Sequence, residues 1–150
     1  MKAGFAMAGG LAGAATLTVI HETVKKLTPN APRMDLMGMM AISKGLHRIG
    51  KNPPNDTKLY WVTMAGDVVS NSLYYAMAGI GNKGNVIWKG LALGISAGIG
   101  AVTLPRPMGL DPSYSKRTMS TALMTIALYT IGGVVSALAM QALKPQRDEN

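Results

Sequence analysis

Asp67 is the residue of this chain best suited to chemistry, because residues 59–82 otherwise have the composition of a membrane-spanning helix. Ser70, Asn71 and Tyr74 follow it at helical spacing and would share one face with it. A carboxylate at membrane depth costs about 2.5–3.5 kcal/mol to insert and is by default a candidate functional site. The spacing therefore predicts a polar stripe, centred on Asp67, along an otherwise apolar helix.

The groups that could meet Asp67 follow from its depth. It lies eight residues inside its helix, about 12 Å at 1.5 Å per residue. His21 and Glu22 lie near the end of the preceding apolar stretch on the same side, and Thr125 lies in the first part of the last stretch. Lys89 enters from the other side, and we expect it to extend to the surface instead. The predicted intramembrane cluster comprises Asp67, Ser70, Asn71, Tyr74, His21, Glu22 and Thr125.

Metal and covalent catalysis have little support in the sequence. The chain has no cysteine, and its two histidines, His21 and His47, lack metal-site spacing. Four methionines between 34 and 40 could bind Cu(I), but flexible thioethers are more often packing groups. We predict no catalytic residue, no metal and no cofactor.

Four apolar stretches must position the polar residues. They cover about 3–24, 59–81, 86–104 and 118–143, and about 20 helical residues span a hydrocarbon core. The sequence therefore predicts an all-α integral membrane protein with four transmembrane helices, forming a single membrane domain over residues 1–150. The first two stretches loosely resemble the last two, which leaves open that the chain arose by duplication of a two-helix unit.

The segment between the first two stretches has a different character. Prolines at 29 and 32 break the chain, and Asp35 is placed to be a helix N-cap. Residues 35–49 then alternate apolar and basic side chains at helical spacing. This pattern predicts an amphipathic helix that lies in the membrane interface.

Small residues recur at four-residue spacing in two of the apolar stretches. The predicted helix-packing glycines are Gly9 and Gly13 in the first stretch and Gly90, Gly94 and Gly98 in the third. Lipid gives helices no hydrophobic reason to associate, so such faces supply close packing. The packing could lie within one bundle or between protomers of a homo-oligomer.

The net charge is +8, and the basic residues are divided unevenly between the two predicted sides of the membrane. Loops 21–58 and 106–117 carry ten of the 15 Lys and Arg residues. The positive-inside rule therefore predicts that these loops are cytoplasmic and both termini outside, in a bacterial inner membrane. Because the basic residues flank apolar spans, we expect anionic lipid headgroups rather than nucleic acid as their partner.

Three classes of function fit these patterns. The first is a protein that acts through helix–helix assembly, as a self-oligomer or an accessory subunit of a membrane complex. The alternative is a small channel or carrier in which Asp67, Asn71 and His21 line a proton or cation path. A membrane enzyme acting on lipid explains nothing further, so an enzyme is not favoured.

Overall fold

The computed structural model describes residues 3–81 and 83–143 of the chain, and these residues are helical with no strand among them. The predicted all-helical class is therefore confirmed for that part of the protein. The elements in order are α1 (Ala3–Leu27), α2 (Met34–Arg48), α3 (Asp56–Ala76), η1 (Met77–Gly79), η2 (Lys83–Asn85), α4 (Val86–Thr103), α5 (Ser113–Lys116) and α6 (Met119–Ala142).

Three helices are long and apolar enough to cross a membrane, namely α1, α4 and α6, with 25, 18 and 24 residues. Helix α3 is long enough, with 21 residues, but it is not apolar enough. Asp67 and its polar neighbours lower its mean hydropathy. A membrane location is thus supported by three apolar helices. The fourth predicted span remains a proposal.

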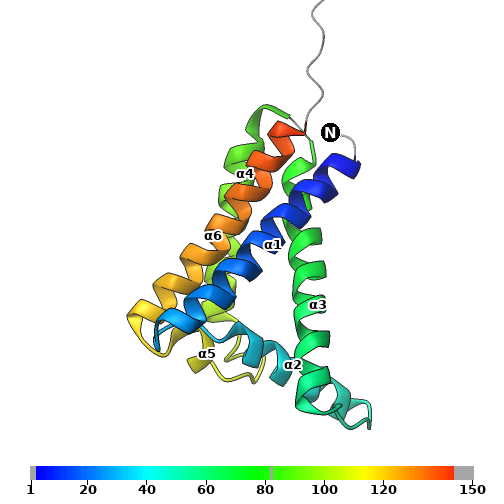
Figure 1. Cartoon of the computed structure of the whole chain (residues 1–150), viewed down its shortest axis with the longest axis vertical. Coiled ribbons are helices and arrows are strands. Elements are labelled where there is room, and N and C mark those ends of the chain that lie inside the picture. Colours follow the sequence, from blue (N-terminus) through cyan, green and yellow to red (C-terminus); the bar gives the residue numbers. More distant parts are fainter. Residues whose placement is uncertain (1–2, 82, 144–150) are drawn as a thin grey trace, which may run out of the picture.

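Helix α6 is the centre of the bundle. It packs lengthwise against both α1 and α4, and α1 in turn packs against α3 (Figure 1). Helices α3 and α4 scarcely contact each other. Toward the end where α1 finishes, α3 diverges from the other long helices, and the shorter α2 runs across that end of the bundle (Figure 1).

Glycine at the α4–α6 crossing lets the two backbones approach. A Cβ atom on Gly94 would lie 2.7 Å from Thr130 Cα, and one on Gly98 would lie 2.6 Å from Ile126 Cα. Gly90 and Gly133 face each other so closely that a side chain on either would clash with the other's carbonyl oxygen. Backbone contact of this kind is how membrane helices associate without a hydrophobic driving force.

Side-chain caps begin two of the long helices. Asn55 Oδ1 accepts a hydrogen bond from the Lys58 amide at 2.9 Å at the start of α3. Thr118 Oγ1 accepts one from the Thr121 amide at 3.0 Å at the start of α6. These bonds satisfy amides that have no partner within the helix.

The predicted N-cap of the amphipathic segment is wrong. Helix α2 begins at Met34, so Arg33 occupies the N-cap position and Asp35 lies in the first turn. Arg33 makes no side-chain cap, and the Asp35 carboxylate is bound by other side chains instead. The helix ends before Gly50, whose φ of 72° favours glycine because a side chain there would be strained.

The connections that flank α2 and α5 are tied together at one end of the bundle. The Arg33 amide donates to the Tyr114 carbonyl at 2.7 Å, and the Arg117 guanidinium donates to the Pro29 carbonyl. The α1–α2 connection and the segment between α4 and α6 therefore form one layer beneath the long helices.

Candidate functional site

Asp67 lies near the middle of α3 and is half-buried. Its Oδ1 accepts a hydrogen bond from Asn71 Nδ2 at 2.9 Å, one turn further along the same helix. The ion pairs among the described residues involve Lys25 and Arg33, and Asp67 takes part in none of them. Its carboxylate is thus held by a neutral amide on its own helix.

A cavity of about 550 Å³ opens in front of Asp67. Helix α3 supplies its polar wall through Asp67, Ser70, Asn71 and Tyr74, and Ser96 adds one hydroxyl from α4. The remaining walls are apolar or small and come from α2, α4, α6 and the segment after α4. They comprise Met34, Met37, Gly38, Ala41, Ala97, Gly100, Ala101, Leu104, Pro105, Met108, Leu110 and Tyr129.

Tyr74 bridges the two walls at one end of this cavity. Its hydroxyl donates to the Leu93 carbonyl of α4 at 3.2 Å. The next residue, Tyr75, is fully buried and donates to the Tyr129 carbonyl of α6 at 2.8 Å. These two bonds fasten this end of α3 to the bundle, and the cavity lies beyond them.

A second, much smaller hollow lies beside Asp67. Its volume of about 10 Å³ is close to the minimum that holds one water molecule. The polar residues that line it are Thr18, His21, Asp67 and Thr125, and the rest of the lining comes from α1, α6, Pro32 and Met34. Asp67, Met34 and Tyr129 line both hollows, so the carboxylate lies where the two adjoin.

His21 is buried and anchored from one side. Its Nε2 donates to the Pro32 carbonyl at 2.8 Å, which fixes the ring against the α1–α2 connection. Because a carbonyl oxygen can only accept, this bond places a proton on Nε2. Nδ1 takes no part in it. Depth on the helices placed His21 near Asp67, and both residues line the same hollow.

Thr125 also reaches this hollow, but its hydroxyl is engaged. It donates to the Ser115 and Thr121 carbonyls, both at 2.8 Å, and the residue is fully buried. The single hydroxyl proton is shared between these two carbonyls, so Thr125 ties α5 to α6.

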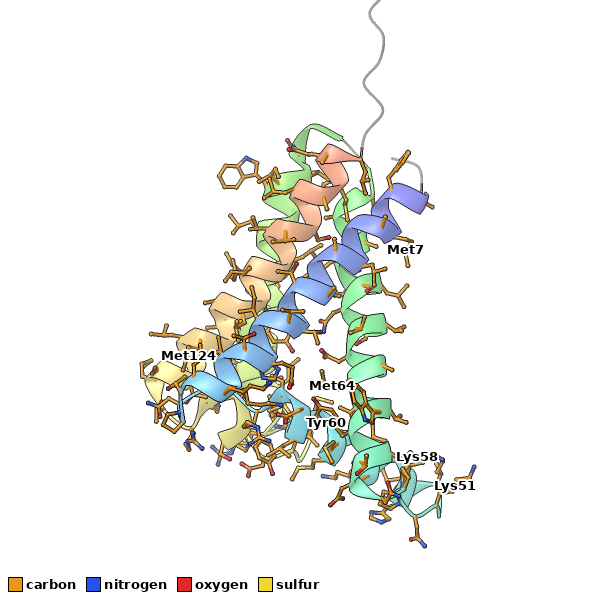
Figure 2. The ribbon with its side chains drawn as sticks, viewed as in Figure 1. Met7, Lys51, Lys58, Tyr60, Met64 and Met124 are labelled. Carbon is orange, nitrogen blue, oxygen red and sulfur yellow. The ribbon has the colours of Figure 1, made fainter. Side chains whose placement is uncertain are left out.

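Glu22 does not reach the Asp67 site. Its carboxylate pairs with Lys25 at 2.7 Å, and Lys25 also contacts Asp35 at 3.1 Å. Arg33 binds Asp35 with two nitrogens, at 3.0 and 2.9 Å. Lys25 additionally lies 5.5 Å from the centre of the Tyr60 ring, which extends from α3 (Figure 2). These charges form an α1–α2 junction of their own.

The electrostatics of this junction are those of a structural ion cluster. Burial alone would raise the pKa of Asp35, but the hydrogen bonds from Arg33 and Lys25 outweigh it and lower that pKa from 3.8 to about 2. Sequence reasoning missed this role of Asp35. The signal in the sequence was the presence of two cations, Lys25 and Arg33, within ten residues of the Asp35 carboxylate.

Sequence reasoning also did not assign the methionine face of α2 to the site. Met37 is buried, and Met34 and Met37 line the cavity next to Asp67. Periodicity alone shows that a helix has an apolar face and does not show what covers it. This face contributes to the candidate site.

The five predicted packing glycines are all buried against helices of the same chain. Gly9 and Gly13 on α1 face α6, as do Gly90, Gly94 and Gly98 on α4. Lys89, one turn into α4, donates to the Ile80 carbonyl, away from the part of α4 that lines the cavity.

The described residues contain no group of three or more His, Asp or Glu side chains that could hold a metal ion. The site therefore offers one carboxylate, a hydrogen-bonding wall and a large apolar surface. Comparisons with family models, with curated proteins and with solved structures found no match to this chain.

Proposed function

We propose that the chain is a small membrane carrier that binds a cation at Asp67, inside the bilayer. The observation that carries the proposal is the cavity of about 550 Å³ in front of this carboxylate. A purely structural carboxylate is expected to bond across helices, whereas the hydrogen bond of Asp67 stays within α3. The carboxylate therefore has capacity for a ligand.

In this proposal α3 is a fourth span. Its 21 residues extend about 31 Å at 1.5 Å per residue, the thickness of a hydrocarbon core. Its polar groups line the cavity, while its exposed large side chains include Val62, Val69 and Leu73. An apolar outer face with polar groups turned inward is the arrangement that a bilayer favours.

The proposed orientation follows from the charge of the two ends. Both α2 and α5 lie at one end of the bundle, opposite the start of α1 and the end of α6 (Figure 1). Lys51 and Lys58 extend from the α2 end (Figure 2). We assign this basic end to the cytoplasm of a bacterial inner membrane, with anionic headgroups around it and α2 in the interface.

The assembly role has less support than the carrier. The glycines that suggested it are buried between helices of one chain, so they do not form a surface for a second protomer. The exposed apolar side chains of α1 and α3 suit lipid as well as a second protein. No observation in the described residues favours a self-oligomer over a monomer in lipid.

Electrical recording from proteoliposomes on a solid-supported membrane tests the proposal. Wild-type protein should give currents on a concentration jump of at least one cation among H⁺, Na⁺, K⁺ and organic ammonium or phosphonium ions. Asp67→Asn should reduce the current at least tenfold. Asp56→Asn is the matched control, because Asp56 is exposed in the first turn of the same helix.

Two results would contradict the carrier. One is the absence of any protein-dependent current over the whole panel. The other is a current that Asp67→Asn leaves unchanged while size-exclusion profile and helical content match the wild type.

A further inference from the structure

The walls of the large cavity define the kind of cation that fits it. Only Asp67 carries a charge among its lining residues, and its polar neighbours lie on the same wall. The opposite walls present Met37, Leu104 and Met108. A ligand that satisfies both walls needs one positive group and a large apolar body.

An inorganic ion is a poor match to this lining. Ca²⁺ takes six to eight oxygen ligands, and Mg²⁺ needs near-octahedral oxygen coordination. The cavity offers one carboxylate, a few hydroxyls and one amide, and much of its surface is thioether or aliphatic carbon. A metal ion there would lose hydration without recovering it from the protein.

The volume suits an organic molecule. Sites for drug-sized ligands measure about 300–1,000 Å³ and are mostly apolar with a few placed polar groups. The cavity, at about 550 Å³, lies within this range. Methionine side chains adapt to different ligand shapes, and Tyr74 and Tyr129 add two aromatic residues to the lining.

The rim of the cavity indicates where a ligand enters. Ser70 on α3 and Ser96 on α4 are exposed, and so are Leu104 and Met108 beyond the end of α4. Because α3 and α4 scarcely contact each other, the opening lies between them. With both helices in the membrane, this opening faces the acyl chains rather than water.

We infer that the cavity binds an amphipathic organic cation, such as an ammonium or phosphonium ion with a bulky apolar body, which enters laterally from the bilayer between α3 and α4. The positive group lies against Asp67 and the apolar body against the methionines of α2. This inference rests on the proposed function, since it names the class of cation that the carrier takes.

Charge is the property that the site selects, so a pair of probes with one shape tests it. Tetraphenylphosphonium and tetraphenylborate have nearly the same size and opposite charge. Wild-type protein in nanodiscs should bind tetraphenylphosphonium above the level of protein-free nanodiscs, and should not bind tetraphenylborate above that level. Asp67→Asn should weaken binding of the cation at least tenfold.

A second variant tests the cavity without changing its charge. A Cβ atom on Gly100 would meet only Leu104 Cδ1, at 3.5 Å, so Gly100→Leu should fold and fill part of the space. We expect it to weaken binding of tetraphenylphosphonium at least fivefold. Gly66→Leu is the matched control, because Gly66 has open space around it and does not line the cavity.

The possible outcomes separate the inference from the proposed function. Asp67-dependent currents of H⁺, Na⁺ or K⁺ without binding of tetraphenylphosphonium would overturn the organic cation and leave the carrier in place. Equal binding of both probes, or unchanged binding in both Asp67→Asn and Gly100→Leu, would also overturn it. Absence of every current and of binding would remove both. If Asp67→Asn fails to fold, the test is the binding of tetraphenylphosphonium by Gly100→Leu compared with that by Gly66→Leu.

Discussion

Asn71 donates its side-chain amide to the Asp67 carboxylate at 2.9 Å, across one turn of α3. Both residues line the same cavity, so the amide holds the carboxylate at the polar wall. A hydrogen bond to a charged group contributes about 1.5–3 kcal/mol, yet this one joins neighbours on one helix and fixes no second helix. The pair is therefore arranged to position a charge rather than to fasten the bundle.

Replacing Asn71 should affect ligand binding more than stability. Asn71→Ala removes the bond that orients Asp67 while keeping the charge, so binding of tetraphenylphosphonium should weaken about three- to tenfold. The melting temperature in detergent should change by only a few degrees. Calorimetric titration and thermal unfolding measure the two effects, and a large loss of stability with unchanged affinity would contradict a positioning role.

The Asp35 cluster should govern acid stability. Folding lowers the pKa of Asp35 to about 2, so its stabilising contribution is present above the ordinary value of 3.8 and is lost as the pH falls toward 2. Wild-type protein should therefore lose stability in this range. Asp35→Asn should be less stable by about 2–3 kcal/mol at pH 7 and should show a weaker pH dependence.

Thermal unfolding from pH 7 to pH 2 measures this effect. Asp56→Asn is a suitable control, because that carboxylate is exposed in the first turn of α3 and belongs to no ion pair among the described residues. Parallel pH profiles for wild type and Asp35→Asn would contradict the assignment.

The α4–α6 glycines should matter to the single chain. Gly94→Leu places side-chain atoms where a Cβ already lies 2.7 Å from the Tyr129 carbonyl oxygen. Overpacking of this kind costs about 1–3 kcal/mol or more, so the monomer itself should unfold at lower temperature. Gly66→Leu should leave the melting temperature unchanged. Loss of an oligomer, with the fold of the monomer intact, would instead place this face between protomers.

The absence of cysteine makes topology directly measurable. Single cysteines at Lys51 and Ser113 should react with an impermeant maleimide only after permeabilisation, and one at Asn85 should react from outside. The positions at 51 and 85 flank α3, so opposite labelling establishes that α3 crosses the membrane. Equal accessibility at both would remove the fourth span and with it the carrier.

Sequence reasoning reached the helical class and the glycines that pack, but not the helices against which they pack. Uninterrupted apolar residues predict helices in a membrane protein because the backbone must satisfy its own hydrogen bonds there. The close approach of Gly90 to Gly133 depends on how two helices cross, and spacing within one helix does not determine its partner.

The candidate site was partly accessible to the same reasoning. Rise per residue placed His21 and Asp67 at similar depth, and they line one hollow. The same arithmetic included Glu22, which turns to Lys25 because depth does not give direction around a helix. The cavity depends on the divergence of α3 from α4, a tertiary feature without a local sequence signal.

Chemical labelling of Asp67 tests the central claim most directly. Dicyclohexylcarbodiimide is membrane-soluble and modifies carboxyl groups in apolar surroundings, and peptide mass spectrometry locates the adduct. The account predicts that Asp67 is modified in lipid and that tetraphenylphosphonium, but not tetraphenylborate, protects it. An unreactive Asp67, or labelling that no cation in the panel slows, would contradict a cation site at this carboxylate.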